Sequence, residues 1–216
     1  MSDKSESKNI AWWVLLFAFV LTILLMFVPK EKVEINPNIL PWNSHFNEQG
    51  DLIALGLTLN KSTPNDATKI FGHDYEILAF SKKDLSGKSV EVYFPTMTIA
   101  NFRVIATLVL DVSDEELEEI YARGATTTIN QSGNRQVNLL SEDSEKLMNN
   151  KIKYITLVPK KNLPEEIIKK RFGEPKFIEK TPEDLPRWFY PKKGLEIIVN
   201  PNAAEILQYY PSVRTQ

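Results

Sequence analysis

The chain has 216 residues, with 26 Lys or Arg against 28 Asp or Glu, and it contains no cysteine. A formal net charge of -2 gives no basic footprint for nucleic-acid binding. The absence of cysteine excludes disulfides, thiol nucleophiles and thiolate metal sites. Hydrophobic residues make up 43% of the chain, which is enough for a core, and the length allows one or two domains.

An uncharged apolar run, IAWWVLLFAFVLTILLMFV, extends from Ile10 to Val28 without Pro or Gly. As a helix rising about 1.5 Å per residue, it would nearly cross a hydrocarbon layer of about 30 Å. The alternative is a cleaved signal peptide, whose apolar region is about 7 to 15 residues long and precedes a small-residue cleavage site. No such site follows the run. The sequence therefore predicts an uncleaved transmembrane helix, with the lipid bilayer as its partner.

The lysines flanking this run do not decide its orientation, because two precede it and two follow it. Residues 1–9 leave little room for function, so we expect them to form a cytoplasmic tail. The C-terminal domain would then lie in the periplasm, anchored to a bacterial inner membrane by a single pass. Residues 29–50 contain three prolines and four asparagines without a sustained period, which predicts a tether.

Two later segments, 51–150 and 151–216, share an ordered set of landmarks. These are Pro64, Phe71-Gly72 and the YFP sequence ending at Pro95 in the first, and Pro164, Phe172-Gly173 and the FYP sequence ending at Pro191 in the second. Pro in the first helical turn loses no intrahelical hydrogen bond. Gly after a helix supplies the left-handed C-terminal position, which costs a residue with a Cβ more. Each Phe-Gly pair is therefore interpreted as a core anchor plus a helix stop, with a ligand-contacting turn as the alternative.

The first segment carries additional elements between its landmarks and the second copy. A helix with capping-box spacing is predicted from Ser113 to Gly124, followed by a hairpin around Ser132-Gly133 and a short helix near 141–150. The predicted fold class is α+β: an N-terminal transmembrane helix, then two tandem repeats of a helix with an antiparallel sheet. The first repeat covers 51–150 with these inserted helices and hairpin, and the second covers 151–216.

The second copy reads LPEEIIKKRFGEP, WFYP, GLEIIVN and AEILQYY in order. This order resembles the small repeat of the BamE/SmpA outer-membrane assembly lipoproteins, and the β-lactamase-inhibitor-protein fold uses a tandem version of that unit. The resemblance covers about 155–211, and 52–112 more loosely. It implies an α+β unit with two helices on an antiparallel sheet, used for protein–protein binding. The chain lacks the lipidated cysteine of those lipoproteins.

The sequence predicts no catalytic, cofactor-binding or metal-binding residue. The GKS sequence resembles the end of a phosphate-binding loop, but Lys82 stands where that motif needs Gly. His45 and His73 are not spaced as metal ligands. An enzyme is therefore not expected. The alternative in this class is an envelope hydrolase that uses carboxylates such as Asp111 or Glu115.

Aromatic residues near the C-terminus are the remaining candidates for a site. Strand alternation places Trp188 and Tyr190 on one face and Phe189 on the other, and it places Tyr210 opposite Tyr209. Leu195, Ile197 and Val199 should share a buried face, opposite Glu196. Exposed aromatic side chains often anchor binding surfaces. We predict that Tyr210 and at least one of Trp188 and Tyr190 are partly exposed and bind the partner.

The predicted function is a membrane-anchored protein-binding module on the periplasmic side. It would be an accessory or scaffold subunit of a membrane assembly that binds another envelope or membrane protein, without nucleic acid. The alternative is a small-ligand or lipid-binding sensor with an apolar pocket between the repeats.

Overall fold

The structure is a computed structural model that describes residues 4–26, 36–99, 102–124, 126–129 and 133–211. The chain divides into two compact units, Met1–Glu34 and Ile35–Gln216. The first contains helix α1 (Lys4–Met26), and the second contains every strand of the described residues.

The structure of helix α1 differs from the transmembrane helix predicted for the N-terminal unit. It begins with the charged sequence KSESK and ends at Met26, whereas the last two residues of the predicted span, Phe27 and Val28, lie outside the described residues. Within the described part of the chain, no helix is long and apolar enough to cross a membrane. This finding contradicts the transmembrane helix predicted from Ile10 to Val28.

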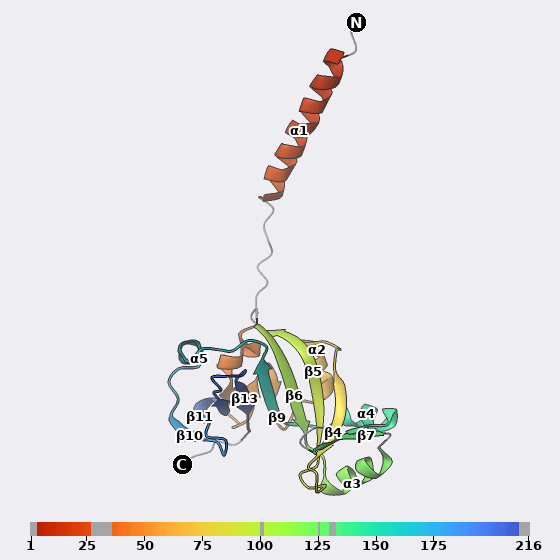
Figure 1. The fold of residues 1–216 in the computed structure, drawn as a ribbon, viewed down its shortest axis with the longest axis vertical. Coiled ribbons are helices and arrows are strands. Elements are labelled where there is room, and N and C mark those ends of the chain that lie inside the picture. The colour runs from red at the N-terminus through yellow and green to blue at the C-terminus, as the bar shows by residue number, and fades with distance from the viewer. Residues whose placement is uncertain (1–3, 27–35, 100–101, 125, 130–132, 212–216) are drawn as a thin grey trace. The chain divides into compact units, whose positions relative to one another are not determined.

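The second unit is α+β, as predicted (Figure 1). Its α-helices are α2 (Pro64–Phe71), α3 (Asp114–Arg123), α4 (Ser141–Leu147) and α5 (Glu165–Phe172). The strands of its large sheet are β4 (Glu76–Ser81), β5 (Ser89–Ile99), β6 (Phe102–Leu110), β7 (Thr126–Ile129), β8 (Arg135–Asn138), β9 (Ile152–Pro159), β10 (Phe177–Lys180), β11 (Pro186–Tyr190), β12 (Leu195–Ile198) and β13 (Ile206–Tyr209). Three short strands, β1 (His45–Phe46), β2 (Leu52–Ala54) and β3 (Leu57–Thr58), form a separate small sheet.

The large sheet is antiparallel, with the strand order β10-β11-β12-β13-β9-β6-β5-β4-β8-β7. Strand β9 pairs with β6 on one side and with β13 on the other. The strands of the two similar segments therefore join in one sheet, a connection between the two predicted repeats that the sequence analysis did not specify. The predicted inserted helices correspond to α3 and α4, and the predicted hairpin to β7 and β8, although residue 132 of its turn lies outside the described residues.

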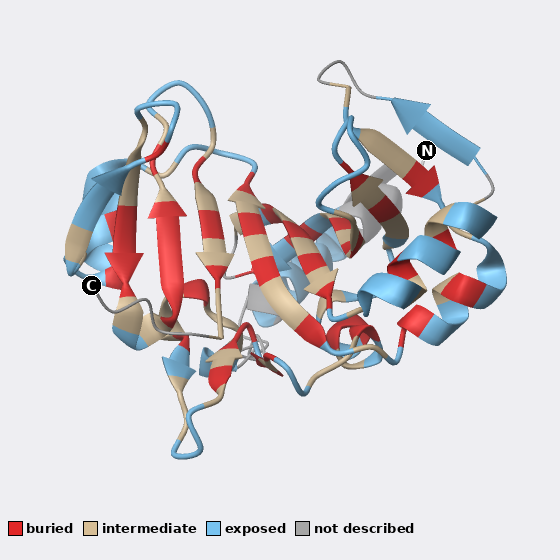
Figure 2. Cartoon of the chain, turned by 90° about the horizontal axis from the view of Figure 1, so that it is seen from below, coloured by how far each residue is buried: buried red, intermediate tan, exposed pale blue. Residues whose placement is uncertain are grey.

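One face of this sheet forms the hydrophobic core, and we call it the covered face. A row of cross-strand partners runs along it: Trp188, Ile197, Leu207, Leu157, Ala106 and Phe94. Every member of that row is buried. Buried and half-buried residues alternate along the central strands in Figure 2, as expected for a sheet with one face in the core.

The helices α2 and α5 end in the same way against this face. Phe71 packs edge-on against Phe94 with ring centroids 5.4 Å apart, and Phe172 packs against Tyr190 at 6.2 Å. The next residues, Gly72 and Gly173, have φ of +93° and +87° and ψ of -175°. The predicted core anchors and glycine stops are thus confirmed. Because ψ is extended, both glycines occupy a region essentially restricted to Gly, rather than the left-handed helical region.

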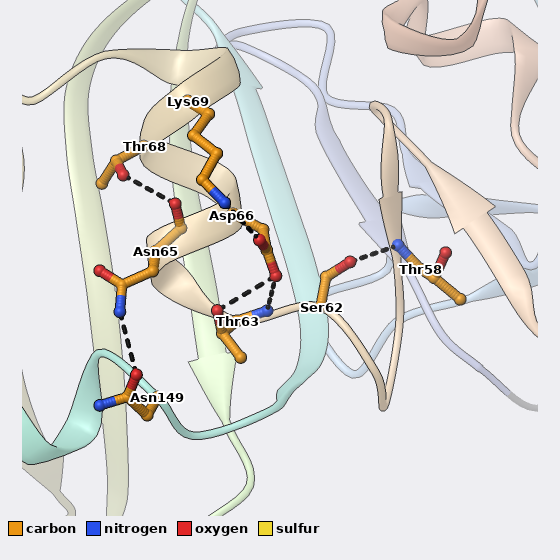
Figure 3. Close-up of polar contacts among 8 residues, drawn as sticks. All are labelled: Thr58, Ser62, Thr63, Asn65, Asp66, Thr68, Lys69 and Asn149. Carbon is orange, nitrogen blue, oxygen red and sulfur yellow. Dashed lines mark hydrogen bonds and ion pairs between the residues drawn. The ribbon is translucent and has the colours of Figure 1, made fainter.

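Polar contacts fix the start of α2 (Figure 3). The Asp66 carboxylate accepts hydrogen bonds from the backbone N–H of Thr63 at 3.1 Å and from its hydroxyl at 3.2 Å. Lys69 also contacts Asp66, at 3.0 Å, and together these contacts lower the pKa of Asp66, with Lys69 as the main cause. The amide of Asn65 donates to the side-chain oxygen of Asn149 at 3.1 Å, which joins α2 to the segment between α4 and β9.

The segment predicted as a tether is folded from residue 36 onward. It contains the 3₁₀ turns η1 (Pro37–Ile39) and η2 (Pro41–Asn43). The fully buried Tyr209 donates its hydroxyl to the carbonyl oxygen of Pro41 at 2.9 Å, and Lys193 donates to that of Trp42 at 2.7 Å. The bond from Tyr209 attaches the segment to the covered face at the interior strand β13, so the sheet core begins well before residue 51.

Replacing Gly72 or Gly173 with Ala should lower the free energy of unfolding by about 1–3 kcal/mol, because the added Cβ is poorly tolerated at this φ and ψ. Nothing lies within 4 Å of either Cβ position, so the cost comes from the backbone alone. The exposed Lys170→Ala is the control and should change stability by less than about 0.5 kcal/mol. Chemical denaturation measures all three, and glycine variants as stable as the control would refute the assigned helix ends.

Tyr209→Phe should destabilise the unit by about 1–3 kcal/mol, because the buried carbonyl of Pro41 loses its hydrogen-bond donor. The matched control is Tyr210→Phe, since the hydroxyl of Tyr210 donates to Gln208 at a partly exposed site. We expect its cost to be below about 0.5 kcal/mol. Equal costs, measured by thermal and chemical unfolding, would contradict the role of Tyr209 in attaching residues 36–46.

Candidate functional site

The opposite face of the large sheet is the candidate site. Two rows of cross-strand partners cross its centre, and their side chains are half-buried. We call the following residues the open face: Leu78, Glu91, Tyr93, Thr107, Val109, Tyr154, Thr156 and Gln208. Tyr210, directly after β13, extends this surface. Five strands (β4, β5, β6, β9 and β13) contribute to the open face, and the core behind them holds these strands in place.

Tyrosines and neutral polar groups dominate the open face. The rings of Tyr154 and Tyr210 lie 5.2 Å apart at 62°, and the Tyr210 hydroxyl donates to the side-chain oxygen of Gln208 at 2.9 Å. The ammonium group of Lys153 lies 5.6 Å from the centre of the Tyr154 ring. The predicted partial exposure of Tyr210 is confirmed, and so is its position opposite the buried Tyr209.

The prediction for Trp188 and Tyr190 is wrong. Their exposed fractions are 3% and 5%, so neither is available to a partner in this structure. Alternation along β11 is as predicted, but Trp188 pairs with Ile197 and Tyr190 with Leu195, which places both aromatics on the covered face. The hydroxyl of Tyr190 donates to the carbonyl oxygen of Gly173 at 3.2 Å, where it helps to hold the end of α5.

Two glutamates on this side of the sheet lie in different environments. Glu196 is buried, as its neighbours Leu195 and Ile197 are, and its carboxylate lies 3.6 Å from Arg187. Glu91 is half-buried and accepts a hydrogen bond from the Ser89 hydroxyl at 3.1 Å. Burial raises the pKa of Glu91 above its ordinary value, because water no longer fully solvates the carboxylate.

An apolar cavity lies on the covered side, where the two similar segments meet. Its lining includes Trp42, Phe102, Leu163, Ile167 and Leu207, and the Arg171 guanidinium lies 4.6 Å from the Trp42 ring centre. The cavity encloses about 30 Å³, which is the space of roughly one water molecule. A lipid chain would therefore need these side chains to move apart, so the cavity does not favour the lipid-sensor alternative.

The two carboxylates named in the hydrolase alternative lie outside the open face and outside the apolar cavity. Asp111 follows β6 and Glu115 lies in the first turn of α3, and both are exposed. The hydroxyl of Ser113 accepts the backbone N–H of Glu116 at 3.2 Å, as the capping spacing predicted. In the described residues, no group of three or more His, Cys, Asp or Glu side chains is arranged to hold a metal ion.

Comparisons with protein-family models, curated proteins and solved structures gave no match for this chain. The resemblance to the BamE/SmpA repeat therefore stays a prediction.

The sequence analysis did not predict that Glu91 and Tyr93 belong to the candidate site, although the sequence of β5 contains a pattern that indicates it. Ser89, Glu91 and Tyr93 alternate with three apolar residues, which is typical of a strand with one solvated face.

Trp188→Ala should cost about 3–5 kcal/mol of stability, because it removes a large side chain from the covered face. Tyr210→Ala should cost much less, since its side chain is already partly exposed. Thermal unfolding of the two variants tests this assignment. A larger loss for Tyr210→Ala than for Trp188→Ala would show that the two faces have been assigned the wrong way round.

Proposed function

We propose that this chain is a protein-binding module and that its open face is the docking surface. The observation that carries the proposal is the gathering of Tyr93, Tyr154 and Tyr210 on one partly exposed sheet face. Tyrosine is enriched among the residues that contribute most to protein interfaces. In this proposal the module is an accessory or scaffold subunit of a larger assembly.

The open face lies on a backbone that is already ordered in the free protein. Each open-face residue lies beside a buried residue on its own strand, as Tyr93 lies between Val92 and Phe94. The backbone beneath the surface is therefore held by core packing before a partner arrives. Binding to a preorganised surface loses less conformational entropy than binding that must first order a loop.

The rest of the surface chemistry suits a protein partner. Thr107, Thr156 and Gln208 form a neutral polar row next to the tyrosines. Such groups can donate and accept hydrogen bonds without the desolvation cost of a full charge. Apolar contact area together with uncharged hydrogen-bonding groups is the usual composition of a non-obligate protein interface.

Site-specific photo-crosslinking tests the proposal. A benzophenone amino acid is placed at Tyr93, Thr107 or Thr156 in the full chain expressed in its native cells, and at exposed Lys170 on α5 as the control. We expect the same crosslinked protein from the three open-face positions and none of it from the control. Crosslinks that are absent from the open face, or no stronger there than at Lys170, would refute the docking surface.

A double variant provides the second readout. Tyr93→Ala with Tyr154→Ala should reduce recovery of that crosslinked protein at least tenfold at the Thr156 position. The melting temperature should fall by only a few degrees, since both side chains are partly exposed. Unchanged recovery would show that the tyrosines do not contribute to binding.

A further inference from the structure

Glu91 has an unusual position for a carboxylate. It lies near the middle of the sheet on β5, with Leu78 of β4 on one side and Val109 of β6 on the other. A β-branched or aromatic residue would suit this half-buried strand position better than Glu. A half-buried charge also loses part of its solvation, so Glu91 is an unfavourable residue for the stability of the sheet.

The groups around Glu91 supply a hydrogen bond but no cation. Ser89 donates to the carboxylate. Burial raises the pKa of Tyr121 on α3 to about 12, and the charge of Glu91 contributes to that rise. Lys88 pairs instead with Glu118 and lies over the Tyr121 ring. Lys153 of β9 lies over Tyr154. Across the described residues, Glu91 forms no ion pair.

We infer that the partner docking on the open face places a lysine or arginine side chain against the Glu91 carboxylate, with its stem over Val109 and Tyr93. This inference rests on the proposed function and names the chemistry of the partner. A cation would restore the interaction energy that Glu91 loses with its water, and the apolar neighbours would cover the aliphatic stem. Tyr93 would add attraction between its ring and the positive charge.

A residue that serves binding rather than folding should lower the stability of the free protein, and Glu91 meets this condition. Its raised pKa means that the folded state binds a proton more tightly than the unfolded state. The resulting stability is present below the ordinary glutamate pKa of about 4.3 and is lost as pH rises through the folded-state pKa. Glu91→Gln keeps the acceptor for Ser89 but removes the charge. It should therefore be at least as stable as the wild type at pH 7.

The experiment uses a probe of defined charge with the full chain. The probe is the blocked peptide Gly-Arg-Gly, and its uncharged counterpart carries citrulline in place of arginine. Amide NMR shifts at residues 90–92 and 108–110 report binding. We expect a saturable response to the arginine peptide, and one at least fivefold weaker for citrulline and for Glu91→Gln. The control Glu166→Gln, at an exposed position on α5, should bind as the wild type does.

Crosslinking to the native partner gives the second readout. Glu91→Gln should lower the crosslink yield from the Thr156 position at least fivefold, with no loss of melting temperature. An equal response to both peptides, or a yield unaffected by Glu91→Gln, would overturn the inference while the crosslinks themselves still support the proposed function. Absence of open-face crosslinks in the wild type would refute the proposed function and, with it, this inference.

Discussion

The antiparallel pairing of β9 with both β6 and β13 is the constraint on which the rest of the structure depends. It joins the strands of two similar chain segments into one sheet, with Leu157 packed between Ala106 and Leu207 on the covered face. Because successive side chains point to opposite faces, this pairing also aligns Thr156 between Thr107 and Gln208 on the other side. The core and the open face therefore follow from one register.

Local patterns in the sequence were sufficient for several features. The two Phe-Gly helix ends are confirmed because a helix stop needs only neighbouring residues and a backbone that Gly alone tolerates. Alternation correctly grouped Leu195 with Ile197 and separated Tyr209 from Tyr210. These predictions depend on a period of two along a single strand, which is present in the sequence itself.

Features that depend on partners across the sheet were not predictable in this way. Alternation shows which residues share a face but not how deeply each face is buried. Trp188 lies inward beside Ile197, and Phe189 and Glu196 on the opposite face are buried as well. The same limitation applies to residues 36–46, whose attachment depends on a hydrogen bond from Tyr209, far away in the chain. The membrane-spanning prediction rested on the length and apolarity of one run and on the missing cleavage site after it, and the described helix α1 does not support it.

The central claim is that the open face, as defined by its residues, is partly accessible while the covered face is not, and hydroxyl-radical footprinting with mass spectrometry tests it most directly. In the full chain, Tyr93, Tyr154 and Tyr210 should be oxidised several times faster than Tyr190 and Tyr209, since the latter two are buried. Rates for Tyr93 and Tyr154 as slow as that of Tyr209 would mean that another part of the protein covers this surface, and the account would be contradicted.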